Sequence, residues 1–344
     1  MNVFVSAPAA RTAPLRSLRR AVALSAAALA MMAPSACGEG RNAPAASASA
    51  SAAPSAITTA APVSNSDAST AALTGTRYYL GMTDREAVIH AVRGDADRVT
   101  ARIPLGSGDC VRNTITISPY GERLAWVEGG VSQSAGTLVT SRVDGSQKRT
   151  VGRKVPFSGK ADCLGSNPLV WNTNDLLMVQ QNGHPVLIDV PDNKPADGDA
   201  GNETLKWWSA NGRRWAAVSE GRPYAATESG PNFYRYTPPK AEAAHHDGWR
   251  VRSVSMDGRY VAVGWMNTDP SRNDGSFAVV DTTTSKVVDL PGGGDIRSIM
   301  FTADGKVIVR RATGITVLDS TFKSLGTVEE PADVSGLTLL AYAA

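Results

Sequence analysis

The sequence predicts an all-β fold assembled from repeats of one four-stranded unit. Apolar and β-branched runs of four to eight residues alternate with Gly, Asp and Asn turns, and no longer segment keeps a helical period. One turn pattern recurs along the chain, and its copies are marked by small polar residues at Ser118, Asn172, Ser209, Ser255 and Thr302. The copies lie 54, 37, 46 and 47 residues apart, close to the roughly 40–45 residues of a propeller blade. We therefore predict a six-bladed β-propeller, with seven blades as the alternative.

The two ends of the repeat region are each incomplete. After residue 77 the chain supplies three strands, RYYLGM, EAVIHAV and RVTARI, without an innermost strand, and GLTLLAYA (336–343) is an unpartnered strand at the other end. We expect the C-terminal strand to complete the first blade, because closing the ring removes exposed sheet edges. The six predicted blades begin at Arg77, Val111, Asn167, Leu205, Arg250 and Ile296.

Glycines fall at one phase of the repeat, at Gly121, Gly212, Gly258 and Gly305. Turn positions of this kind commonly need a positive φ, which glycine adopts without a Cβ clash. Asp257 and Asp304 precede two of these glycines, where an aspartate can accept hydrogen bonds from the turn backbone. The pattern predicts a tight turn between the first two strands of each of these blades.

The N-terminus predicts export. Arginines precede an apolar stretch of 13 residues, Ala21–Ala33, which is shorter than the about 20 residues of a membrane-spanning helix. We expect residues 1–36 to be a signal peptide. Four of the 35 basic residues and none of the 32 acidic residues lie in that segment, so the rest of the chain is near neutral.

Small residues at Ser35 and Ala36 directly precede Cys37. This junction resembles the lipobox of bacterial lipoproteins, and the resemblance implies that Cys37 is acylated after cleavage. Pro34 stands where that pattern has a large aliphatic residue, so an ordinary signal peptide is the alternative. Residues 37–76, rich in Ala, Ser and Pro, are expected to be a disordered tether, and residues 77–344 the propeller domain.

The stretch SPYGERLAW (118–126) and its weaker copies resemble the repeats of TolB-like and WD-repeat-like β-propeller domains of secreted bacterial lipoproteins. The resemblance covers most of residues 77–344, and the alanine-rich composition suggests an actinobacterial source. The Gly-His and Trp-Asp marks of eukaryotic WD repeats do not recur along the chain. Because the shared motif is structural, the resemblance implies a fold and leaves the function open.

Two cysteines remain in the predicted domain. Cys110 and Cys163 precede the turn residues of adjacent blades by eight and nine positions, so we expect their loops to lie side by side. An exported pair predicts a disulfide, with a chain-entropy contribution of about 4 kcal/mol. A metal or redox pair is the alternative, although neither a C-x-x-C motif nor a nearby histidine supports it.

Three further patterns suggest chemistry without a matching motif. His245, His246 and Asp247 form a polar loop rather than a metal site, because adjacent histidines of an extended chain point to opposite sides; with Trp249 they are a candidate binding loop. The acidic segment 192–203 does not match a calcium-binding loop, and the glycines at 292–294 are expected to connect two blades. We predict no metal and no cofactor.

The tryptophans are expected to pack rather than to bind a ligand. Four of them occupy strand phases that fill the space between blades: Trp126, Trp171, Trp208 and Trp265. Trp207 and Trp215 alternate with these and are candidates for the surface.

The sequence favours a binding module of the cell envelope over an enzyme. No G-x-S-x-G nucleophile motif is present, and near-neutral charge argues against nucleic acid as a partner. We expect a monomer outside the cytoplasm, held at the membrane by its lipid anchor alone, that binds an envelope protein or a small ligand; secretion is the alternative location. The alternative functions are a propeller enzyme, a lyase or sugar-acting enzyme with its site at the central channel mouth, and a sensor of envelope state.

Overall fold

The computed structural model describes residues 73–105, 114–129, 135–156, 169–181, 184–197, 206–219, 222–227, 230–233, 249–265 and 277–344. All of them belong to one of the two units of the chain, residues 62–344. The predicted signal peptide and tether lie outside these residues, apart from the last few tether positions. No helix of the described ranges is long and apolar enough to cross a membrane.

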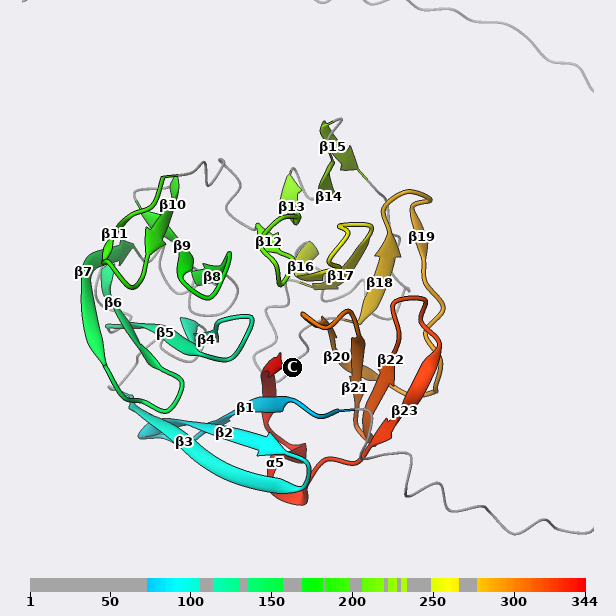
Figure 1. The fold of residues 1–344 in the computed structure, drawn as a ribbon, viewed down its shortest axis with the longest axis horizontal. Coiled ribbons are helices and arrows are strands. Elements are labelled where there is room, and N and C mark those ends of the chain that lie inside the picture. Colours follow the sequence, from blue (N-terminus) through cyan, green and yellow to red (C-terminus); the bar gives the residue numbers. More distant parts are fainter. Residues whose placement is uncertain are drawn as a thin grey trace, which may run out of the picture. The chain divides into compact units, whose positions relative to one another are not determined.

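The described strands form six four-stranded antiparallel sheets arranged around a common centre (Figure 1). The first sheet, in the order β24-β1-β2-β3, consists of β1 (Thr76–Met82), β2 (Glu86–Arg93), β3 (Ala96–Pro104) and β24 (Thr338–Ala343). The second consists of β4 (Thr116–Ile117), β5 (Arg123–Glu128), β6 (Ala135–Arg142) and β7 (Arg149–Pro156). The third consists of β8 (Leu169–Trp171), β9 (Leu176–Gln181), β10 (His184–Asp189) and β11 (Lys194–Pro195).

The remaining three sheets follow in chain order. The fourth consists of β12 (Trp207–Trp208), β13 (Trp215–Ser219), β14 (Arg222–Thr227) and β15 (Gly230–Phe233). The fifth consists of β16 (Trp249–Val254), β17 (Tyr260–Trp265), β18 (Ala278–Asp281) and β19 (Lys286–Val287). The sixth consists of β20 (Ile296–Phe301), β21 (Val307–Arg311), β22 (Gly314–Leu318) and β23 (Ser324–Val328), and the short helix α5 (Ala332–Ser335) leads to β24.

These sheets give the chain an all-β propeller architecture. As the incomplete ends of the repeat region predicted, β24 joins the first sheet beside β1, with Arg77 opposite Tyr342 and Leu80 opposite Thr338. The innermost strands contact one another in the series β24, β4, β8, β12, β16 and β20. The first and last strands of the described chain therefore share one sheet.

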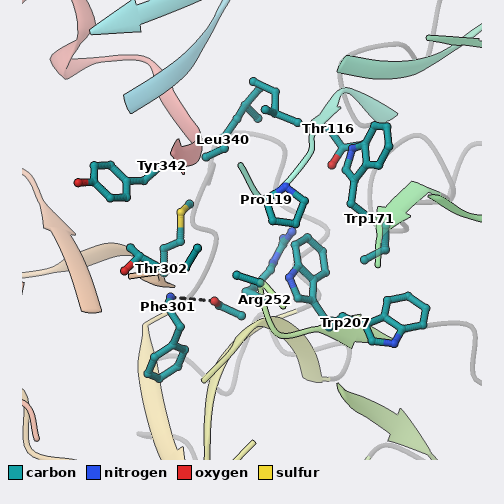
Figure 2. A pocket seen from close by; sticks show the side chains of 17 residues that line it. Thr116, Pro119, Trp171, Trp207, Arg252, Phe301, Thr302, Leu340 and Tyr342 are labelled. Atoms are coloured by element: carbon teal, nitrogen blue, oxygen red, sulfur yellow. Dashed lines mark hydrogen bonds between the residues drawn. The ribbon is translucent and has the colours of Figure 1, made fainter. Parts of the chain in front are cut away.

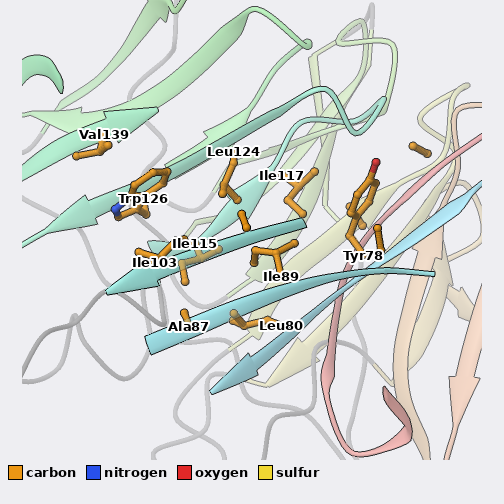
Figure 3. Packing of buried hydrophobic residues seen from close by; sticks show 14 residues of the cluster. Tyr78, Leu80, Ala87, Ile89, Ile103, Ile115, Ile117, Leu124, Trp126 and Val139 are labelled. Carbon is orange, nitrogen blue, oxygen red and sulfur yellow. The ribbon is translucent and has the colours of Figure 1, made fainter. Parts of the chain in front are cut away.

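The hydrophobic core is divided among the gaps between neighbouring sheets. Six clusters of buried side chains lie one in each gap, including the gap between the sixth sheet and the first. Figure 3 shows the cluster between the first and second sheets, where Ile89 and Ile103 pack with Leu124 and Trp126. Burial of these apolar faces is the main favourable term that holds each pair of sheets together.

Three of the four tryptophans predicted to fill the gaps do so. Trp126, Trp171 and Trp208 are 3%, 5% and 7% exposed, and each belongs to a different inter-sheet cluster. The side chain of Trp265 lies outside the described set. Trp207 and Trp215 are only partly buried, as their alternating positions suggested.

The repeated turn has the predicted geometry. Its glycines have positive φ angles of 72°, 71°, 79° and 79° at Gly121, Gly212, Gly258 and Gly305. The preceding Ser or Thr hydroxyl closes the turn: Ser255 Oγ accepts the N–H of Tyr260 at 2.9 Å and donates to Asp257 at 2.6 Å. Asp257 in turn accepts the N–H of Arg259 at 3.0 Å, so this aspartate bonds to the turn backbone as predicted.

The third sheet departs from this pattern. The sequence comparison aligned Asn172 with the turn hydroxyls, but Thr173 Oγ1 is the atom that accepts the N–H groups of Asp175 and Leu176. Asn172 instead donates from Nδ2 to the carbonyl of Gly212 in the next sheet, at 3.2 Å. This turn has no glycine, and its hydroxyl has moved one position along the chain.

A buried ion pair ties the sixth sheet to the closing strand. Arg310 and Glu330 lie 2.9 Å apart, with side chains only 4% and 3% exposed. The same guanidinium donates to the carbonyls of Val334, Ser335 and Leu337, at and just after α5. It also lies 5.3 Å from the ring centre of Tyr79 on β1. One side chain thus connects β21, α5 and the first sheet.

We predict that Arg310→Met lowers the free energy of unfolding by about 3–5 kcal/mol, because it leaves the Glu330 carboxylate buried without its partner. Chemical denaturation measures this change. The control is Glu86→Gln, which removes one member of the exposed pair with Arg102 and should cost less than about 1 kcal/mol. Equal losses for the two variants would contradict a structural role for the buried pair.

Two glycine variants separate backbone strain from crowding. A Cβ at Gly121 would lie 2.7 Å from both the Cβ of Ala343 and the ring of Tyr78, whereas a Cβ at Gly305 meets nothing within 4 Å. Both glycines have positive φ, so Gly305→Ala should lower the free energy of unfolding by about 1–2 kcal/mol through backbone strain alone. Gly121→Ala should lower it by about 1–3 kcal/mol more, because its Cβ also clashes with its neighbours. The denaturation midpoints of the two variants test this. Equal losses of stability would show that β24 shifts to accommodate the added Cβ at no cost in free energy.

Candidate functional site

A cavity lies where the innermost strands converge. Its volume is about 90 Å³, and residues of all six innermost strands or of the turns that follow them line it (Figure 2). We call it the central cavity and define it by Ile117, Trp171, Trp208, Arg252, Phe301 and Leu340, one from each of these strands. Among the described residues that line it there is no aspartate, glutamate or histidine.

The walls of the central cavity are mainly apolar. Trp171, Trp207 and Trp208 contribute indole rings from two adjacent sheets, and Ile117 and Val170 add aliphatic surface. The polar residues of the lining mostly serve the fold. Ser253 Oγ accepts the N–H of Phe301 at 2.9 Å and thereby joins the fifth and sixth sheets, and Thr302 closes its own turn.

Arg252 supplies the cationic group of the cavity. It lies on β16, where the pairing with β17 shifts between Val251 and Ser253, so Arg252 has no partner across the ladder. A bulge of this kind changes the direction in which a side chain points. Figure 2 shows Arg252 extending from its strand towards Pro119, across the space between the lining residues.

Burial dominates the electrostatics of this strand. It lowers the pKa of Arg252 to about 10, so the guanidinium stays charged at neutral pH. Burial, and secondarily the charge of Arg252, also lower the pKa of Arg250. The Nε atom of Arg252 is buried without a hydrogen-bond partner, and so is the indole Nε1 of Trp171. Two residues that line the cavity therefore each carry an unsatisfied donor.

A second buried cation lies in the adjacent fourth sheet. Lys206 is 3% exposed, and its Nζ lies 4.1 Å from the ring centre of Trp215 and 5.5 Å from that of Trp208. Cation–π contacts of this kind stabilise an ammonium group that has been removed from water. Lys206 does not line the cavity, so Arg252 is the charged side chain that does.

The structure does not describe most of the predicted site residues. Cys37, Cys110, Cys163, His245, His246 and Asp247 all lie outside the described ranges. Only the backbone of Trp249 is described, in β16 opposite Trp265. The acylation of Cys37, the disulfide and the binding loop therefore stay predictions.

Other predicted features have a described environment. Asp192, in the acidic segment, forms an exposed ion pair with Lys194 at 2.7 Å. Within the described ranges no group of three His, Cys, Asp or Glu side chains could hold a metal ion. Gly292–Gly294 connect β19 to β20 as predicted, and Arg311 donates to the carbonyls of Pro291, directly before them, and of Gly294, the last of the three.

A comparison of the repeats sets Arg252 apart in the sequence. The position three residues before the turn residue is Ile115, Leu169 and Ile299 in three repeats, and all three side chains are buried in the core. The same position holds Lys206 and Arg252 in the fourth and fifth repeats. Two cations at a position that is otherwise apolar mark the part of the ring where the repeats stop being equivalent.

No family model matches the chain, and no curated protein matches it. Solved structures with similar folds include TolB from Acinetobacter baumannii, with 13% identity and a TM-score of 0.48 over 79% of this chain and 67% of that one. A chain of a nidogen/laminin complex has 9% identity and a TM-score of 0.44, over 78% and 99%. Kluyveromyces lactis Hsv2 has 13% identity and a TM-score of 0.39, over 70% of each chain. All three TM-scores are below 0.5, so these likenesses carry no functional argument.

The unsatisfied donors of the cavity predict an unusual effect of mutation. Arg252→Met should raise the free energy of unfolding of the ligand-free protein by about 1–3 kcal/mol, because it removes a buried charged group whose Nε lacks a partner. Urea denaturation at pH 7 measures the change.

The matched control is Arg297→Met on β20. Arg297 Nη1 donates to the carbonyl of Ser335 at 2.9 Å, so its loss should lower the stability instead. A destabilised Arg252→Met protein would show that the guanidinium serves the fold.

Proposed function

We propose that this chain is an extracytoplasmic, lipid-anchored binding scaffold whose propeller presents the central cavity and the surrounding turns to a ligand or an envelope protein. The observation that carries the proposal is the central cavity itself. Six sheets converge on a partly polar cavity, two of whose lining residues carry donors without an acceptor in the described part of the chain, and a site of this kind is suited to binding.

The location and the attachment rest on the N-terminal sequence. In this proposal residues 1–36 direct export, Cys37 carries the lipid, and the segment up to residue 76 holds the propeller at a distance from the membrane. The six sheets are the full set of blades, and Cys110 and Cys163 form a disulfide that joins the second and third blades in the oxidising compartment. The protein acts as a monomer and without a cofactor.

A propeller enzyme, the alternative function, would need acid–base groups at the channel. The residues that line the central cavity include one guanidinium and the phenol of Tyr342, whose oxygen accepts the N–H of Gly75 at 3.0 Å. General acid–base catalysis usually relies on histidine or carboxylate side chains. The sparse polar lining supports a binding role over a catalytic one.

Lipid attachment can be tested by metabolic labelling with an alkyne fatty acid, followed by mass spectrometry of the mature N-terminus. We expect label in the native chain and in Cys110→Ser, and none in Cys37→Ala. An unmodified Cys37, or a terminus beyond it, would exclude the anchor.

The binding face can be tested by photo-crosslinking in cells. Tyr120, 46% exposed, follows the cavity residue Pro119, whereas Val287, 45% exposed, lies on the outer strand β19. A photoreactive residue at position 120 should crosslink a discrete envelope partner, and one at position 287 should not. Crosslinks from position 287 alone would place the binding face at the outer edge instead.

A further inference from the structure

Arg252, on β16, is a charged residue at a repeat position that is apolar in three other repeats. The equivalent positions in three other repeats are buried and apolar, and the fold there needs no charge. The bulge at Arg252 turns this residue out of the strand ladder and into the lining of the central cavity. We expect the burial of a guanidinium at this site to weaken the free protein, and this favours a use of the charge other than packing.

Two residues of the cavity lining carry hydrogen-bond donors that lack acceptors. Arg252 Nε and Trp171 Nε1 are both donors, both are buried, and neither has a partner. The lining, as far as its residues are described, contains no carboxylate that could accept from them. Buried donors are usually paired, so the missing component is an acceptor supplied from outside the described chain.

Charge and size restrict this acceptor further. A single guanidinium balances one negative charge, and the surrounding tryptophan and aliphatic walls offer nothing to balance a second. A carboxylate carries one charge, has two oxygens and matches the planar guanidinium fork. A cavity of about 90 Å³ is larger than a single water needs, so it has room for a small organic acid or for the end of a chain.

We propose that the central cavity binds a carboxylate on a small apolar body, with the guanidinium of Arg252 and the indole N–H of Trp171 as its donors. This proposal rests on the proposed binding function and specifies the chemistry of its ligand. The carboxylate has two sources with the same chemistry, a free short-chain acid or the C-terminus of a peptide chain. The apolar wall formed by Trp171, Trp207 and Trp208 contacts the aliphatic part in either case.

Calorimetric titration of the purified full chain tests the proposal. The probes are propionate and its neutral analogue propionamide, together with N-acetyl-Ala-Ala as the free acid and as the amide, all at constant ionic strength. We expect at least one acid to bind at least tenfold more tightly than its amide. Binding of propionate identifies a free acid as sufficient, and binding of the dipeptide acid alone identifies a chain terminus.

Variants assign the binding to the named donors. Arg252→Met should weaken binding of the acid at least tenfold, Arg252→Lys should weaken it less, and Trp171→Phe should weaken it several-fold. Arg297→Met, on the neighbouring strand but outside the cavity lining, should leave the affinity unchanged. The lysine and phenylalanine variants keep the test valid if Arg252→Met fails to fold.

Equal binding of acids and amides, or an affinity that Arg252→Met and Trp171→Phe leave unaltered, would overturn the proposal. The absence of any binding would overturn it as well. Crosslinking from position 120 reports the scaffold function separately, so a protein that crosslinks its partner but binds no carboxylate would keep the proposed function and lose only this inference.

Discussion

Closure of the ring by β24 is the constraint on which the rest of the structure depends. The last strand of the chain completes the first sheet, so the six inter-sheet clusters include one between the first and last sheets. The fit at this seam is close: a Cβ at Gly75 would lie 2.0 Å from the carbonyl oxygen of Ala343. The hydroxyl of Tyr342 accepts the N–H of Gly75, and the Arg310–Glu330 pair anchors the segment that leads into β24. Every sheet therefore packs against a neighbouring sheet on each face, and the ring of described sheets has no free end.

Closure also determines where a site can form. The innermost strands are brought together at the centre, and three of them are only two or three residues long: β4, β8 and β12. Short strands at a narrow centre leave a cavity between side chains instead of a continuous core. The site is thus a consequence of the ring, and its chemistry depends on which residues the individual repeats place there.

The repeats are regular where they stabilise the fold and irregular where they line the cavity. The turn hydroxyl and the positive-φ glycine recur in four sheets because each hairpin needs the same tight reversal. The position three residues earlier changes from isoleucine or leucine to Lys206 and Arg252 in two adjacent sheets. Lys206 is stabilised by two indole rings, whereas Arg252 keeps an unpartnered Nε, and this difference is the basis on which we propose a binding role for Arg252 alone.

The sequence by itself determined the all-β class, the repeat, the turn glycines and the pairing of the C-terminal strand with the first blade. These features follow from local sequence patterns and from the need of edge strands for a hydrogen-bonding partner, so they can be predicted from one sequence. In the third repeat Asn172 has the backbone position of the turn residue, since its N–H bonds to the carbonyl of Leu176, but the sequence did not indicate that Thr173 supplies the turn hydroxyl, because either side chain suits such a turn. Only the tertiary structure decided that Arg252 and Trp171, separated by 81 positions, line one cavity with unsatisfied donors. The physical reason is that this proximity arises from a bulge and from the convergence of six strands, and neither leaves a spacing in the sequence.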